Sequence, residues 1–118
     1  MGKKVLMADD SGAMLKIGEM ILSKLGCEVV TAVDGNEAVA KATAEKPDIV
    51  LLDAEMPEMD GWEACKEIRK GFPAIPILMC TGHDLTGEEG QLTEAGADGF
   101  ITKPYNHATM GEKLKPYL

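Results

Sequence analysis

The run I-V-L-L at residues 49–52 is apolar at every position and ends in a carboxylate, Asp53. A strand covered on one face only alternates apolar and polar residues, so this run predicts a strand that helices cover on both faces. Four other short apolar runs also have strand character. The five predicted strands are Lys4–Ala8, Glu28–Ala32, Ile49–Asp53, Ile77–Thr81 and Gly99–Thr102.

The first and last of the predicted helices have clear limits. Ser11 is a good N-cap for the first helix, and Gly26 is a good stop signal. The last helix is expected to run from about Asn106 to near Leu114, because Pro116 would clash with its continuation. The apolar face of the first helix is expected to consist of Met14, Ile17, Ile21, Leu22 and Leu25.

The other three helices each open with a cap residue three positions before a glutamate, which is the capping-box spacing. These caps are Asp34, Asp60 and Thr86. The helix after Thr86 has few large apolar residues and contains Gly87 and Gly90, which lower helix propensity. We therefore expect it to be the most mobile of the helices.

Strands that alternate with helices predict parallel pairing through right-handed crossovers. The expected fold is α/β: a flavodoxin-like, doubly wound sheet of five parallel strands in the order 2-1-3-4-5, with five helices. A chain of 118 residues has the size of one domain, so residues 1–118 are expected to form a single domain. Sheets of this kind bind their ligands at the carboxyl ends of the strands.

Charge and cysteine usage exclude several classes of protein. A net charge of -8 argues against direct binding to nucleic acid, which usually requires a basic face. No apolar stretch approaches the length of a membrane span, and the first apolar segment is too short for a signal peptide. The three cysteines are widely spaced, which favours reduced, buried thiols over disulfides or zinc. These features predict a cytoplasmic protein without membrane association.

Polar side chains follow four of the predicted strands. Asp9 and Asp10 follow the first, Asp53 ends the third, Thr81 ends the fourth and Lys103 follows the fifth. In the expected strand order these ends are neighbours, so three carboxylates, a hydroxyl and an ammonium should converge. One lysine cannot offset three acids, which predicts a hard divalent cation, Mg²⁺, with oxygen ligands. A carboxylate beside Mg²⁺ and a lysine can attack phosphorus, which predicts an aspartyl-phosphate.

These residues lie in motifs that resemble, in order and over essentially the whole chain, the receiver domain of two-component response regulators. The motifs are V-L-M-A-D-D, D-G-N-E-A, D-I-V-L-L-D-A-E-M-P-E-M-D-G, P-I-L-M-C-T-G and A-G-A-D-G-F-I-T-K-P. The resemblance implies that Asp53 is the phosphoacceptor, that Asp10 binds the metal directly and that Asp9 assists. It also implies that Glu55 lends its backbone carbonyl to the metal.

The resemblance assigns four further positions. Thr81 is the expected switch hydroxyl, Lys103 the expected phosphate-pairing lysine and Phe100 the expected aromatic switch. The peptide bond between Lys103 and Pro104 falls where the family has a cis bond. The side chains of Glu55 and His83 are expected to flank the mouth of the pocket and to alter the access of water.

The implied activity is phosphorelay signalling. A sensor histidine kinase or a phosphotransfer protein would present a phosphohistidine, and the chain would catalyse only its own phosphotransfer and dephosphorylation, so it is not expected to be an enzyme in the usual sense. The phosphoryl group would draw in Thr81 and Lys103, Phe100 would swing inward, and the face made by the fourth helix, fifth strand and fifth helix would change. That face would act on an unknown downstream protein target.

Three other interpretations remain open. The chain could be a degenerate receiver that serves as a phosphorylation-independent docking module. A small phosphohydrolase with an aspartate nucleophile would usually have a second aspartate where this chain has Glu55, and a cap for its substrate. A flavin-binding protein of the same fold would need a hydroxyl-rich loop where this chain has Asp9 and Asp10. The chain is either a stand-alone regulator or a piece excised from a longer one.

Overall fold

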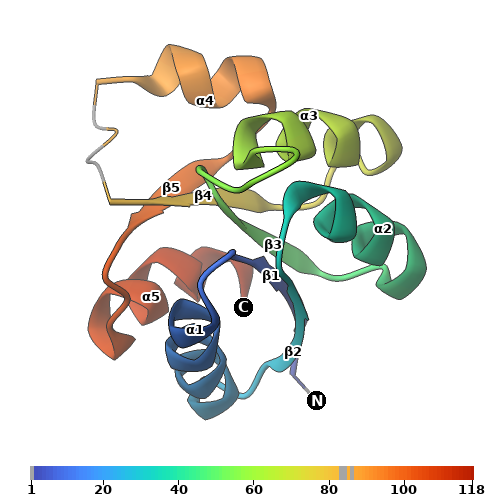
Figure 1. Ribbon diagram of the computed structural model, residues 1–118. Coiled ribbons are helices and arrows are strands. Elements are labelled where there is room, and N and C mark those ends of the chain that lie inside the picture. Colours follow the sequence, from blue (N-terminus) through green and yellow to red (C-terminus); the bar gives the residue numbers. More distant parts are fainter. Residues whose placement is uncertain (1, 83–84, 86) are drawn as a thin grey trace.

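The computed structural model describes residues 2–82, 85 and 87–118. Within these residues, five parallel strands form one sheet in the order β2-β1-β3-β4-β5, which confirms the predicted topology (Figure 1). Each strand has the predicted bounds. The strands are β1 (Lys4–Ala8), β2 (Glu28–Ala32), β3 (Ile49–Asp53), β4 (Ile77–Thr81) and β5 (Gly99–Thr102).

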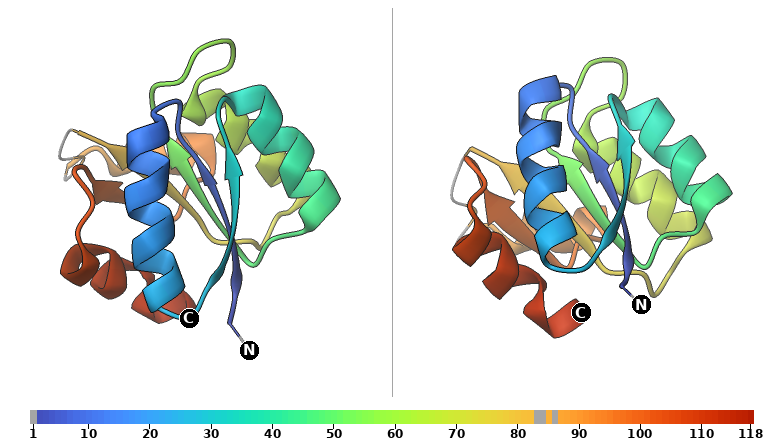
Figure 2. Two further views of the ribbon diagram at one scale, coloured as in Figure 1. Left: turned by 60° about the horizontal axis from the view of Figure 1, so that its bottom comes forward. Right: turned by 90° about the horizontal axis from the view of Figure 1, so that it is seen from below.

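Helices cover both faces of the sheet (Figure 2). Side chains of α1 and α5 pack in one apolar cluster, and side chains of α2, α3 and α4 pack in the other. The helices are α1 (Gly12–Lys24), α2 (Gly35–Glu45), α3 (Gly61–Gly71), α4 (Glu89–Ala95) and α5 (His107–Leu114), and a 3₁₀ turn, η1 (Lys115–Tyr117), follows α5.

The central strand β3 explains why its sequence lacks alternation. It pairs with β1 on one side and with β4 on the other, and all five of its residues are buried. Val50 and Leu52 point into the cluster under α2, α3 and α4, whereas Ile49 and Leu51 point into the cluster under α1 and α5. Successive side chains of a strand face opposite sides, so a strand between two helical layers must be apolar throughout.

The predicted caps form at the described helix ends. Asp34 accepts a hydrogen bond from the Glu37 N–H at 2.7 Å, and Asp60 accepts one from the Glu63 N–H at 2.9 Å. The last helix was expected to start at about Asn106, and Asn106 is its N-cap residue, which accepts from the Thr109 N–H at 2.8 Å. These bonds satisfy amide groups that have no partner within the helix.

Two expectations about helices were wrong in detail. Ile17 is 41% exposed and does not belong to the buried face of α1, which runs through Leu15 and Gly18 instead. Adjacent helical residues are about 100° apart, so Ile17 lies beyond the edge of that face. The fourth helix was expected to contain Gly87, but α4 begins only at Glu89. The cap expected at Thr86 lies outside the described residues. Gly87 has a φ of +89°, which a right-handed helix cannot contain.

Other expectations concern burial. All three cysteines are buried and free of disulfides. Within the described part of the chain, no helix combines the length and apolar character that crossing a bilayer demands. The core consists of two apolar clusters, one between the sheet and each layer of helices.

Candidate functional site

The polar residues singled out in the sequence meet at the carboxyl end of the sheet. Asp9 directly follows β1, Asp53 ends β3, Thr81 ends β4 and Lys103 directly follows β5. Because the strands are parallel and these four are neighbours in the sheet, their carboxyl ends reach the same edge. The predicted convergence of these residues is therefore confirmed.

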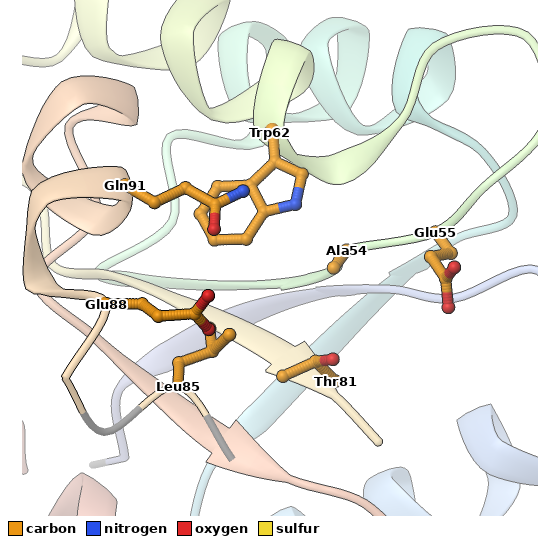
Figure 3. Close-up of a pocket in the computed structure, with 7 residues that line it drawn as sticks. All are labelled: Ala54, Glu55, Trp62, Thr81, Leu85, Glu88 and Gln91. Carbon is orange, nitrogen blue, oxygen red and sulfur yellow. The ribbon is translucent and has the colours of Figure 1, made fainter. Parts of the chain in front are cut away.

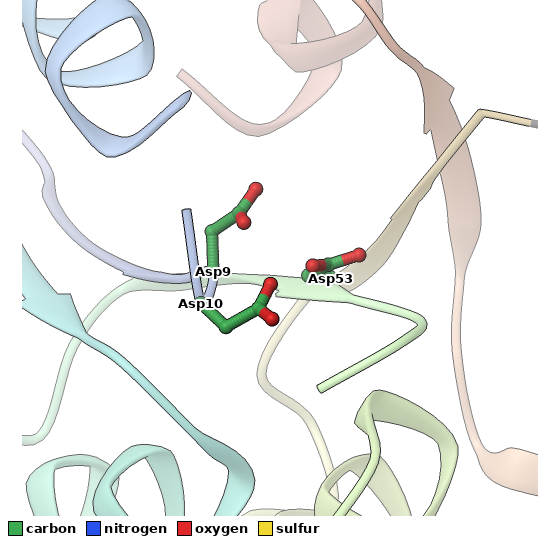
Figure 4. Close-up of side chains that lie close together, drawn as sticks. All are labelled: Asp9, Asp10 and Asp53. Carbon is green, nitrogen blue, oxygen red and sulfur yellow. The ribbon is translucent and has the colours of Figure 1, made fainter. Parts of the chain in front are cut away.

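Three carboxylates form the centre of this site (Figure 4). Asp9, Asp10 and Asp53 each offer one oxygen, and these oxygens all lie within 4.8 Å of one another. Asp9 is fully buried and Asp53 is 5% exposed, whereas Asp10 is exposed. The site therefore has two inward carboxylates and one that faces solvent.

The backbone and one lysine hold the two buried carboxylates. Oδ1 of Asp9 accepts a hydrogen bond from the Ser11 N–H at 2.9 Å, and Oδ1 of Asp53 accepts one from the Glu55 N–H at 3.2 Å. The ammonium nitrogen of Lys103 lies 2.9 Å from Oδ2 of Asp9 and 3.0 Å from Oδ1 of Asp53. The Lys103 N–H donates to the Thr81 carbonyl at 2.7 Å, which ties the lysine to the end of β4.

The charges in this site shift each other's protonation. Burial raises the pKa of Asp53 to about 6, and the nearby carboxylate of Asp9 adds to the rise, whereas hydrogen bonds from Lys103 and the Glu55 N–H oppose it. Burial by itself lowers the pKa of Lys103, but contacts with Asp9 and Asp53 outweigh burial and raise that pKa. Asp9 and Asp53 hold Lys103 in its charged form. The single positive charge of Lys103 does not offset the burial of Asp53 and the nearby charge of Asp9, so the pKa of Asp53 stays raised.

The donor set fits a hard cation. Three carboxylates carry three negative charges and Lys103 supplies one positive charge, so a divalent ion would neutralise the remainder. The candidate ligands are all oxygens, which is the set that Mg²⁺ prefers. Glu55 is exposed at the rim, and its predicted contribution is a backbone carbonyl rather than its side chain.

The predicted switch residues are Thr81 at the end of β4 and Phe100 on β5. Thr81 is 5% exposed and borders a cavity of about 390 Å³ (Figure 3). Phe100 is half-buried on the edge strand β5, and the ammonium of Lys113 lies 4.5 Å from its ring centroid. The peptide bond between Lys103 and Pro104 is cis. The expectation for His83 falls outside the described residues, while Glu55 does line the cavity.

Sequence reasoning missed three contributions to this site. It identified Ser11 only as a helix cap, but the Ser11 N–H also orients Asp9. It gave Gly61 no role at this site, but the α-carbon of Gly61 packs against the backbone of Asp53 and Ala54. It gave Trp62 no role at this site, but the indole of Trp62 forms a wall of the cavity beside Thr81. The Ser11 bond is local, whereas the contacts of Gly61 and Trp62 join separate elements. The sequence carries only a weak signal for those two contacts, the pair of Asp60 and Gly61 at the start of α3.

The chain is similar to known proteins in sequence. The family model described as the response regulator receiver domain matches residues 5–115. The transcriptional regulatory protein PhoP for alkaline phosphatase synthesis, from Bacillus subtilis, is 38% identical over all 118 residues, which cover 49% of that relative. The chain thus spans about half the length of the curated relative that it matches.

Solved structures agree with the family model. The chemotaxis protein CheY4 of Vibrio cholerae has a TM-score of 0.93 and 35% identity, with 100% of both chains covered. The receiver domain of the sensor histidine kinase PA1611 of Pseudomonas aeruginosa has a TM-score of 0.88 and 28% identity, with 99% of this chain and 98% of that chain covered. That structure contains a magnesium ion coordinated in its active-site cleft. Together with the convergent acids and lysine, these matches show that the chain belongs to the response regulator receiver domain family and serves in two-component phosphorelay signalling.

Proposed function

We propose that residues 1–118 act as one receiver domain, which takes a phosphoryl group from a phosphohistidine onto the carboxylate of Asp53. The donor would be a sensor histidine kinase or a phosphotransfer protein. The observation that carries this proposal is the position of Asp53, whose Oδ1 accepts from the Glu55 N–H and contacts Lys103 while Oδ2 has no hydrogen bond or ion pair with any described residue. Oδ2 is thus the oxygen that is available to react.

The proposed transfer uses these contacts. Oδ2 of Asp53 attacks the phosphorus, the new O–P bond forms as the P–N bond to the histidine breaks, and the imidazole nitrogen keeps the bonding electron pair. The ammonium of Lys103, 3.0 Å from Asp53, is placed to pair with a phosphoryl oxygen. The hydroxyl of Thr81 would donate a hydrogen bond to another phosphoryl oxygen. Hydrolysis reverses the modification, when water attacks the phosphorus and Asp53 leaves as a carboxylate.

Four groups would hold Mg²⁺, namely the carboxylates of Asp9, Asp10 and Asp53 and the backbone carbonyl of Glu55. When bound, the ion would neutralise charge on the phosphoryl oxygens and offset the repulsion among the acids. The ion pair with Asp9 holds the ammonium of Lys103 beside Asp53. The chain would catalyse only its own phosphotransfer and dephosphorylation.

Phosphorylation would then act as a switch. Movement of Thr81 toward the phosphoryl group would shift the segment between β4 and α4, and Phe100 would turn inward from the edge of β5. The α4–β5–α5 face would thereby change for a downstream protein target. Support for this role of α4 comes from its short length and from its N-cap residue, Glu88, which makes no side-chain capping bond.

The decisive experiment treats the chain with acetyl phosphate and Mg²⁺ and follows its mass. The expected result is a mass gain of one phosphoryl group that requires Mg²⁺. The gain should be absent when Mg²⁺ is chelated before acetyl phosphate is added, and absent in Asp53→Asn. Labelling of Asp53→Asn at the wild-type rate would contradict the proposal. Multiple turnover of unrelated phosphate esters would favour a phosphohydrolase instead.

A further inference from the structure

The cavity beside Thr81 lies between the N-terminal ends of α3 and α4 (Figure 3). Its volume is about 390 Å³, enough for a large side chain. Trp62 extends from α3 over the cavity, and Ala54, the residue after Asp53, leaves it open because its side chain is small. The described lining residues are Ala54, Glu55, Trp62, Thr81, Leu85, Glu88 and Gln91.

Two carboxylates, those of Glu55 and Glu88, lie on this cavity. Glu55 and Glu88 are exposed, and neither side chain makes a hydrogen bond or ion pair with any residue that the structure describes. Figure 3 places them at opposite ends of the cavity, with the indole of Trp62 between them. No lysine or arginine is among the described residues of the lining. The cavity therefore offers negative charge and an aromatic face, and its described lining contains no cation.

These groups fit a planar cation. A guanidinium stacks on an indole through cation–π attraction and also pairs with a carboxylate, whereas an ammonium is a compact point charge that stays strongly hydrated. A phosphate or a carboxylate would be repelled by Glu55 and Glu88. The chemistry of the cavity therefore favours an arginine side chain.

The electrostatics of phosphotransfer supply a reason for such a contact. The chain carries a net charge of -8, and its site gathers three carboxylates around the position that the phosphoryl group must reach. A phosphohistidine brings further negative charge to this edge. Basic groups on the donor beside its phosphohistidine would offset the repulsion and speed the encounter.

We propose that the cavity bounded by Trp62 and Glu88 receives an arginine side chain of the protein that donates the phosphoryl group. The inference rests on the proposed function, since it assigns the chemistry of the donor for that same site. The cavity adjoins Thr81 and Ala54 at the ends of β4 and β3, so a donor whose phosphohistidine reaches Asp53 brings its neighbouring side chains over the cavity.

A first experiment measures the subsite directly. Trp62 is the only tryptophan of the chain, so intrinsic tryptophan fluorescence reports this wall. Titration with N-butylguanidine is expected to give a saturable change, and titration with the uncharged N-butylurea is expected to give none. An equal or unsaturable response to both compounds would overturn the proposal.

Two variants that each remove one carboxylate test whether N-butylguanidine binds beside Glu88. Glu88→Gln is expected to weaken the apparent affinity for N-butylguanidine about two- to fivefold, the size expected for one exposed ion pair. Glu88 makes no capping hydrogen bond, so the substitution leaves α4 intact. The matched control is Glu94→Gln, which makes the same change on the same helix but does not line the cavity beside Thr81. Glu94 lines a second cavity, which shares Trp62 and Gln91 with the first. Equal weakening in both variants would place the guest elsewhere and refute the assignment.

A second experiment identifies the source of the cation. A histidine kinase that phosphorylates the wild-type chain is compared with acetyl phosphate as the donor, for wild type, Glu88→Gln and Glu88→Lys. Transfer from the kinase should slow about two- to fivefold in Glu88→Gln and further in Glu88→Lys, while the rate with acetyl phosphate stays unchanged. Kinase transfer that is insensitive to both variants would overturn this inference alone. Failure of both donors to label Asp53 in the wild type would overturn the proposed function as well.

Discussion

Gly61 packs directly against the backbone carbonyl of Asp53. A β-carbon at Gly61 would overlap the carbonyl oxygen of Asp53 and lie 2.7 Å from its carbonyl carbon. The Gly61 N–H also donates to the carbonyl of Ala54 at 3.1 Å. The first turn of α3 and the end of β3 are thus locked together, and the position of the candidate nucleophile depends on the absence of a side chain at residue 61.

Gly61→Ala is expected to lower the free energy of unfolding by about 1–3 kcal/mol, because the obstructing atoms belong to the backbone. The displaced Asp53 should also react more slowly with acetyl phosphate. Urea denaturation and the rate of mass gain measure the two effects. Gly71→Ala, at the other end of α3, is the control, since its β-carbon would meet nothing within 4 Å. Similar losses in both variants would mean that helix α3 tolerates no alanine, rather than that Gly61 positions Asp53.

Asp10→Asn removes one of three like charges from the acidic cluster. Because Asp10 is the exposed member of the three, the fold should persist while the affinity for Mg²⁺ falls by roughly tenfold, the scale of losing one nearby unit charge. Isothermal titration calorimetry with Mg²⁺ measures the change. Glu63→Gln removes the same charge from the exposed surface of α3 and should leave the affinity near the wild-type value. Wild-type affinity in Asp10→Asn would exclude Asp10 as a ligand.

Glu58 adopts a φ of +69° in the loop between β3 and α3. A residue with a β-carbon is strained there, and glycine is not. Glu58→Gly is therefore expected to raise the free energy of unfolding by about 1 kcal/mol, as measured by urea denaturation. Glu67→Gly, within the regular backbone of α3, should instead lower it by about 1 kcal/mol. A loss of stability in Glu58→Gly would show that the loop is not strained at this residue.

The caps of α2 and α4 differ, and so should the effects of removing them. Asp34 accepts from the Glu37 N–H at 2.7 Å, whereas Glu88 at the start of α4 makes no capping bond. Asp34→Ala should cost about 1 kcal/mol of unfolding free energy, and Glu88→Ala should cost much less. Denaturation midpoints of the two variants test this contrast. Equal costs would mean that the difference in capping has no energetic weight.

Much of the fold could be predicted because its signals are local. The apolar run of β3, the cap at Asp34 and the stop at Gly26 each depend on residues close together in the chain, and the crossover rules then restrict the strand order. The site followed from the same logic, since residues at the carboxyl ends of neighbouring parallel strands must meet. For that reason the sequence alone predicts that Asp9, Asp53 and Lys103 lie together.

Other features could not be read from neighbouring residues. Ile17 has the periodicity of a buried residue, yet the packing of α1 on the sheet leaves it exposed. The contact of Gly61 with Asp53 and the cavity between Trp62 and Glu88 depend on how α3 and α4 pack over the ends of β3 and β4. Periodicity and capping specify an element and its inward side, but the separation between two elements is set by the shapes of all the side chains between them. The chain's primary structure therefore encodes which groups react, while three-dimensional packing sets the space around them.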